Sequence, residues 1–165
     1  MRIVVNDSSA LIDLKKGGLL EILVDLPFEF VVSDALVADE LLSFSKNETA
    51  FMRRKMTVVS LSGDEMVAAA KLQSSTPSLS LHDCTALIIA QREAGCILLT
   101  GDRRLRAEAE AAKVECHGVL WVVEELAKAK LMPQKELLLA LETWRDDITV
   151  RLPRSELLQA MQRLK

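Results

Sequence analysis

The sequence lacks the excess of positive charge that proteins binding nucleic acid over their whole surface carry. Lys and Arg number 21 against 24 Asp and Glu, so the formal net charge is -3 at pH 7. This balance excludes general attraction of the chain to a polyanion. Any contact with nucleic acid must therefore come from a local basic patch.

Long apolar runs and a disulfide pattern are also missing. No apolar run reaches the roughly 18 residues that a membrane helix needs, and no apolar stretch precedes a small-residue cleavage site near the N-terminus. The three cysteines, Cys84, Cys96 and Cys116, lie in apolar segments without paired short spacings, so we expect reduced core residues. Together these absences predict a soluble, cytoplasmic protein that makes no membrane contact.

Several enzyme signatures do not occur. The chain has neither a Gly-x-Ser-x-Gly elbow nor a Gly-x-x-x-x-Gly-Lys phosphate loop. A haloacid-dehalogenase-type site needs a second acid two positions after the first, and Ser9 stands there. His82, Asp83 and Cys84 are consecutive, so on a helix they point about 100° apart and cannot form a triad.

What the sequence does have is the size and pattern of one α/β domain. The chain has 165 residues, half of them apolar, which suffices for a single core. Short β-branched runs alternate with longer stretches of helical period, as expected of βαβ units and a parallel sheet. We expect one domain over residues 1–165, with a helical tail from about residue 133 packed on it or extending from it.

The expected elements follow from this alternation and from local start and stop signals. The expected strands are residues 3–6, 28–32, 56–61, 96–100 and 114–116. The expected helices are 8–16 (capped by Ser8 or Ser9), 19–23, 33–44, 62–73, 81–93, 103–112, 119–130, 133–144 and a last helix after an extended piece at 148–152. Residues 53–55 are expected in a polar connection.

Four acids stand out by their places in this pattern. Asp7 and Asp102 follow two apolar strands, and loops at the carboxyl ends of parallel strands form the ligand crevice of such sheets. Glu40 is expected to face the core, where an unpaired carboxylate needs a cation or another partner. Asp83 stands at the start of an otherwise apolar helix. These four residues are the candidate site.

Each acid also has a purely structural interpretation. An Asp after a strand can cap the following helix, and Ser80 with Asp83 fits a capping box. A salt bridge at the edge of the core would account for Glu40. Because the spacings between the four acids are long, only the fold could bring them together.

The chain resembles a known family at these positions. The resemblance rests on four motifs, which are Val4-Val5-Asn6-Asp7-Ser8-Ser9, then Glu40 in a helix, then Leu79-Ser80-Leu81-His82-Asp83, then Leu98-Leu99-Thr100-Gly101-Asp102. In this order they resemble the PIN-domain ribonucleases, and among these the toxins of bacterial and archaeal toxin–antitoxin pairs. The resemblance covers nearly the whole chain. It implies a three-layer α/β/α fold with a central, mostly parallel sheet.

The resemblance also implies a metal site. By position, Asp7, Glu40, Asp83 and Asp102 correspond to the family's acidic quartet, which binds Mg²⁺ or Mn²⁺, and Ser9 matches the hydroxyl residue that supports the first acid. Hard divalent cations prefer oxygen ligands, and clustered carboxylates repel each other unless a cation neutralises them. The implied reaction is hydrolysis of RNA phosphodiesters by metal-activated water, leaving a 5′-phosphate and a 3′-hydroxyl.

Basic residues beside an acid are candidates for RNA contact. Arg103, Arg104 and Arg106 directly follow Asp102 and are placed to bind RNA phosphates, although helix solubility explains them as well. Further candidate partners are an antitoxin protein, received in an apolar groove beside residues 37–44, and a second copy of the chain. The competing hypothesis is a catalytically inert PIN-like protein-interaction module.

Overall fold

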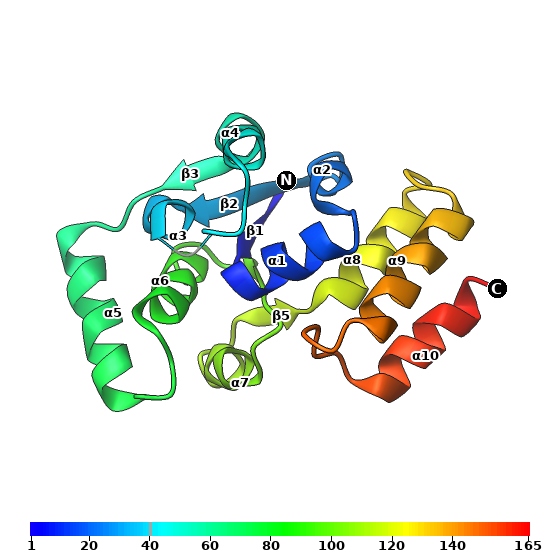
Figure 1. The fold of residues 1–165 in the computed structure, drawn as a ribbon. Helices are drawn as coiled ribbons and strands as arrows, with labels where there is room; N and C mark the ends of the chain where they lie inside the picture. The colour runs from blue at the N-terminus through cyan, green and yellow to red at the C-terminus, as the bar shows by residue number, and fades with distance from the viewer. Residues whose placement is uncertain (40) are drawn as a thin grey trace.

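The computed structural model describes residues 1–39 and 41–165 and shows a five-stranded, all-parallel sheet. The strands are β1 (Arg2–Asn6), β2 (Phe28–Ser33), β3 (Thr57–Val59), β4 (Ile97–Leu99) and β5 (Glu115–His117), in the order β3-β2-β1-β4-β5 (Figure 1). Central strands β1 and β4 pair in register, with Asn6 opposite Leu99. The expected parallel sheet is confirmed.

Alternation along the strands divides the apolar residues between two cores. Val4 and Ile97 belong to one buried cluster, whereas their neighbours Val5 and Leu98 belong to another, as side chains of period two on a doubly covered sheet must. The first core is covered by α1 (Ser8–Lys16), α2 (Leu20–Leu23), α3 (Asp34–Asp39), α4 (Lys46–Lys55), α8 (Val119–Lys128), α9 (Gln134–Asp146) and α10 (Arg154–Arg163). The second core is covered by α5 (Gly63–Ser75), α6 (Leu81–Ala90) and α7 (Arg103–Ala111). The fold is therefore three-layered, α/β/α.

Capping boxes begin three of the helices. Ser62 opens α5 and Ser80 opens α6, each accepting a hydrogen bond from the backbone N–H three residues on while the acid there binds back, as expected from the sequence. A third box, Ser45 with Glu48, opens α4. That helix was not predicted, because its sequence is polar and only Met52 is buried.

Four local predictions were wrong. The helix expected to continue to Phe44 ends at Asp39, and residues 53–55 form the last turn of α4. Neither Ser8 nor Ser9 is the N-cap of α1. The N-cap residue is Asp7, whose side chain makes no capping hydrogen bond. The segment 148–152, expected to be extended, begins with a turn at residues 148–149, and Ile148 is 96% exposed.

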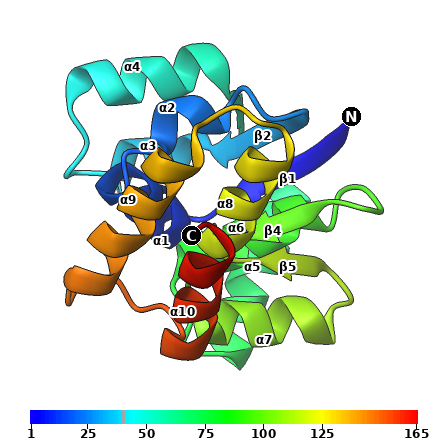
Figure 2. The same ribbon diagram turned by 90° about the vertical axis from the view of Figure 1, so that its right-hand side faces the viewer.

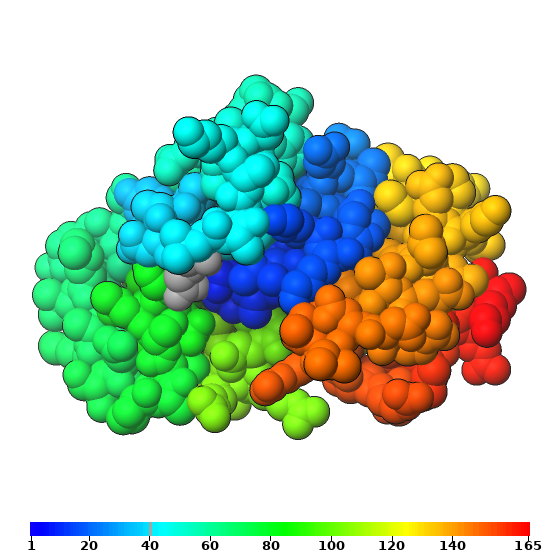
Figure 3. Space-filling model, in the orientation of Figure 1, coloured from blue at the N-terminus to red at the C-terminus, as the bar shows by residue number. Residues whose placement is uncertain are grey.

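The helices of the C-terminal third share the core of the sheet. Trp144 of α9 is buried, and its indole N–H donates to the carbonyl of Asp13 in α1 at 2.7 Å. Leu157 of α10 belongs to the same apolar cluster as Val4. Figure 2 shows α8, α9 and α10 gathered on one side of the molecule, and Figure 3 shows the orange surface of α9 against the blue surface of α1.

Two further findings bear on the composition. All three cysteines are free thiols, with Cys84 and Cys96 buried and Cys116 half-buried. Across the described ranges, none of the helices combines the length and the apolar character needed to cross a membrane.

Candidate active site

Asp7 lies at the point where the order of the strands reverses. Strand β1 has β2 on one side and β4 on the other, so the chain crosses from one half of the sheet to the other between these strands. Crevices for ligands form at the carboxyl ends of the strands at such a point. Asp7 directly follows β1, its N–H donates to the carbonyl of Leu99 at 3.0 Å, and its side chain is 1% exposed.

Two hydroxyl groups hold one oxygen of the Asp7 carboxylate. Ser9 Oγ donates to Asp7 Oδ2 at 2.7 Å, and Thr100 Oγ1 donates to the same oxygen at 2.8 Å. Each hydroxyl also accepts a backbone N–H at 3.0 Å, from Gly101 and Asp102 respectively. Since the backbone bonds occupy acceptor positions on both hydroxyls, their protons are directed to Oδ2, and the carboxylate is fixed in one orientation.

The other oxygen of Asp7 is the chemically unusual one. Oδ1 is buried and has no hydrogen-bond partner among the described residues. Burial raises the pKa of Asp7 from its ordinary value of 3.8 to about 6, and the negative charge of Asp83 raises it as well, although the Ser9 and Thr100 hydrogen bonds lower it. A buried carboxylate oxygen without a donor has the chemistry of a cation ligand.

The structure describes two more of the predicted acids. Asp83 is half-buried on α6 and accepts a hydrogen bond from the Ser80 N–H at 2.9 Å. Its negative charge is close enough to raise the pKa of Asp7. Asp102 caps α7, where its Oδ1 accepts from the N–H groups of Arg104 at 2.8 Å and Leu105 at 3.2 Å. The capping interpretation thus holds for these two acids.

The fourth acid, Glu40, lies outside the described residues. Over residues 1–39 and 41–165, no three His, Cys, Asp or Glu side chains are grouped closely enough to hold a metal ion. The residues around Asp7 nevertheless fit a cation, because Oδ1 is buried without a donor beside a second acid.

A family model described as a PIN domain matches residues 3–165, nearly the whole chain. The chain belongs to the PIN-domain family. PIN domains are generally nucleases, and nucleases of this kind generally use divalent metals. No curated protein matches the chain significantly.

Two cavities flank the predicted basic residues of this PIN domain. One, of about 380 Å³, is lined by Arg103 and Arg106. The other, of about 790 Å³, is lined by Arg103 and Arg104 together with Ser9 and Asp13. The arginines therefore face hollows that begin at the loop holding the Asp7 carboxylate.

Sequence reasoning missed two polar residues at this site. Thr100 was expected at the end of a strand and within the motif that leads to Asp102, but not as a partner of Asp7, to which its hydroxyl donates; a polar residue ending the neighbouring central strand was the available signal. Asp13 is 9% exposed, and burial raises its pKa to about 6. It lies one helical turn after Ser9, so the period of α1 places both on one face.

Proposed function

We propose that this PIN domain is a metal-dependent endoribonuclease that hydrolyses RNA phosphodiesters. The Asp7 carboxylate carries the proposal: two hydroxyls fix one oxygen, while the other is buried without a donor among the described residues. An oxygen so placed at the switch point of a parallel sheet suits a cation better than it suits a structural role.

Asp7, Asp83 and Asp102, with Glu40, are the residues proposed to hold Mg²⁺ or Mn²⁺. A bound ion would lower the pKa of a water molecule and polarise the phosphoryl oxygen. In the proposed reaction, the oxygen of a water molecule bonds to phosphorus, the bond between phosphorus and the 3′ oxygen breaks, and a proton from the water ends on the 3′ oxygen, so the products carry a 5′-phosphate and a 3′-hydroxyl.

The chain's own residues supply orientation and charge. Ser9 and Thr100 keep the Asp7 carboxylate from rotating, so a ligand on its free oxygen meets a fixed geometry. Arg103, Arg104 and Arg106 are proposed to bind the phosphates of the RNA strand, since guanidinium groups match phosphate oxygens in pairs.

Cleavage of single-stranded RNA by the purified protein in Mg²⁺ or Mn²⁺ tests the proposal. We expect Asp7→Asn to lower the rate by more than about a hundredfold, because it weakens a metal ligand. The matched control is Asp25→Asn, an exposed acid between α2 and β2, which should cleave at the wild-type rate. An Asp7→Asn protein that cuts RNA at the native rate would refute the proposal.

Thermal unfolding with added Mn²⁺ gives a second readout that does not depend on activity. A ligand at one hundred times its Kd stabilises the folded state by about 2.7 kcal/mol, so the melting temperature of the wild type should rise. The same addition should leave Asp7→Asn and Asp83→Asn unshifted. Equal shifts in all three proteins would place the ion elsewhere.

A catalytically inert interaction module is the second candidate function. It is favoured by the lack of a three-ligand metal cluster within the described part of the chain. An inert module should show neither RNA cleavage nor a shift with Mn²⁺ that depends on Asp83. The two measurements above therefore separate the candidates.

The toxin role goes one step further. If the protein is a cytoplasmic toxin, a short neighbouring reading frame should encode an antitoxin, and co-purification with that protein should suppress RNA cleavage. Light scattering of the free chain would show whether it forms a homodimer. Absence of a neighbouring frame would count against the toxin role and leave the nuclease proposal standing.

A further inference from the structure

The smaller of the two cavities is built from three separate parts of the chain. Its walls come from the loop after β4, from the junction of β5 and α8, and from the segment 151–156 before and within α10. Its volume, about 380 Å³, falls in the range of small-molecule sites. It shares Gly101 and Asp102 with the larger hollow beside Ser9, so it opens next to the proposed catalytic residues.

Two arginines lie on the wall that both cavities share. Arg103 comes from the first turn of α7, and Arg151 comes from the segment between α9 and α10. Within the described parts of the chain neither guanidinium has a hydrogen bond or an ion pair, whereas Arg92, Arg145 and Arg163 each bind an acid. Both residues are exposed, and the smaller cavity is also lined by Asp102, Glu124 and Glu156, of which Glu124 pairs with Arg163. Two guanidinium groups that line one hollow and have no acid partner among the described residues are suited to bind a phosphate group.

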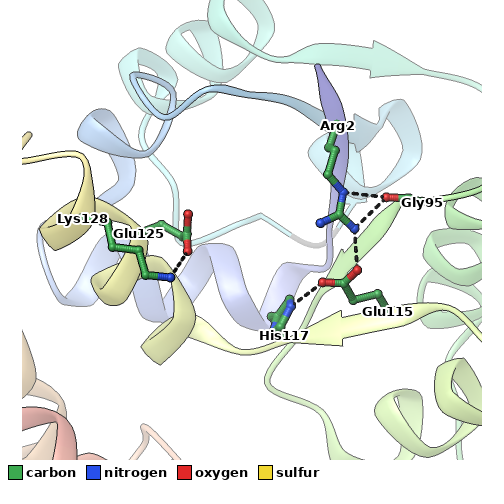
Figure 4. Close-up of polar contacts among 6 residues, drawn as sticks. All are labelled: Arg2, Gly95, Glu115, His117, Glu125 and Lys128. Carbon is green, nitrogen blue, oxygen red and sulfur yellow. Dashed lines mark hydrogen bonds and ion pairs between the residues drawn. The ribbon is translucent and has the colours of Figure 1, made fainter.

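A pair of stacked rings lines the same cavity. His117 and Trp121 lie parallel, with ring centroids 4.7 Å apart and planes 9° apart. Glu115 binds His117 Nε2 at 2.8 Å, and Arg2 binds Glu115 and the Gly95 carbonyl, so the imidazole is anchored across the sheet (Figure 4). Anchored rings offer a base an apolar contact at little entropic cost.

We propose that this cavity is a nucleotide subsite for the RNA strand beside the scissile phosphate. Arg103 and Arg151 bind the phosphate, and the His117–Trp121 pair contacts the base. The inference rests on the proposed ribonuclease function, because that function makes RNA the ligand of this cavity. It assigns the segment 149–153, which carries no regular structure, a role in holding substrate.

Binding of a fluorescein-labelled single-stranded RNA, measured by anisotropy over a range of salt concentrations, tests the phosphate contact. All proteins carry Asp7→Asn so that the RNA stays intact. Adding Arg151→Ala should weaken binding about tenfold, as for loss of one charge-assisted contact. The slope of log K against log salt should become shallower by about 0.7, the value for one phosphate on a single strand.

Arg54→Ala is the control for net charge. Arg54 is exposed on α4, beside the opposite edge of the sheet from β5, and its removal should leave affinity and salt slope nearly unchanged (Figure 1). Equal effects of Arg54→Ala and Arg151→Ala would overturn the subsite. So would an Asp7→Asn parent that binds no RNA.

The base contact has its own test. His117→Ala should weaken RNA binding several-fold, whereas His117→Phe should restore it, because a second aromatic ring can stack on Trp121. Equal losses in both variants would reject ring stacking.

Failure of the subsite and failure of the ribonuclease proposal remain distinguishable. If the wild type cleaves RNA but Arg151→Ala binds like its parent, only the subsite falls. If the wild type cleaves no RNA but binding depends on Arg151, the subsite stands and the catalytic proposal falls.

Discussion

At the residue scale, the two oxygens of Asp7 have opposite environments. Oδ2 accepts two hydroxyl protons, while Oδ1 is buried with no donor within the described ranges. Without a bound cation, keeping this carboxylate ionised costs free energy, because burial penalises the charge more than the hydroxyls favour it. Burial also makes it costly to ionise Asp13 on α1, whose pKa is likewise raised to about 6. A functional cation would relieve the strain at Asp7.

This penalty predicts how stability depends on pH in metal-free buffer. Between about pH 4 and 6 these two carboxyls keep protons in the folded chain that they have released in the unfolded chain, so their contribution to the free energy of unfolding should fall as pH rises. For Asp7, the difference between a pKa of 3.8 and about 6 corresponds to about 3 kcal/mol. The contribution of Asp13 has the same sign, and solvent screening makes it smaller. Urea unfolding at several pH values measures the fall.

Substitution should remove the dependence one carboxyl at a time. Relative to the wild type, the free energy of unfolding of Asp7→Asn and of Asp13→Asn should each rise between pH 4 and 6, whereas Asp25→Asn, at an exposed site, should follow the wild type. A curve for either variant that runs parallel to the wild-type curve across this interval would contradict the assignment of that buried acid.

At the scale of elements, α1 begins directly after Asp7 and carries Ser9, and its position depends on α9. The C-cap of α1, Gly17, faces Trp144 so closely that a Cβ there would lie 2.8 Å from three indole atoms. The same indole donates to Asp13 of α1. Glycine is required here for close approach rather than for its backbone angles, since φ is -79°.

Gly17→Ala should therefore destabilise the protein. A methyl group at 2.8 Å from a buried indole forces α1 and α9 apart, and such overpacking costs about 1–3 kcal/mol. Gly63→Ala is the matched control, because nothing lies within 4 Å of a Cβ at that first position of α5. Chemical denaturation compares the two; equal stabilities would show that α9 moves away without cost.

At the scale of the whole molecule, the C-terminal helices belong to the main core. Residues of α9 and α10 share one buried cluster with β1 and α1, and the family match extends to residue 165. Shared burial couples the unfolding of the parts, because exposing one removes the apolar contacts of the other. We therefore propose that residues 1–165 form one domain.

Equilibrium unfolding in urea tests this unity. Trp121 and Trp144 report on α8 and α9, whereas circular dichroism reports on all helices. The two transitions should coincide in midpoint and slope, as in a two-state domain. A tryptophan transition at lower urea would show that the C-terminal helices unfold separately.

Features that depend on residues close together in the chain could be predicted from the sequence. Three such features involve residues no more than four positions apart, so the local pattern predicts them. They are the alternation within β1 and β4, the capping boxes at Ser62 and Ser80, and the acid after each central strand. The α/β class and the candidate acids follow from them. Where local signals were weak the reading failed, as at α4, the early end of α3 and the segment 148–152.

The hydrogen bonds that hold Asp7, by contrast, depend on how distant parts of the chain pack together. Thr100 lies 93 positions away in the sequence, and its hydroxyl reaches Asp7 because β4 pairs beside β1. The order of strands also brings the loop after β4 to α1 and the segment 149–153 to both cavities. These contacts join distant parts of the chain, and their geometry depends on packing that no local pattern encodes.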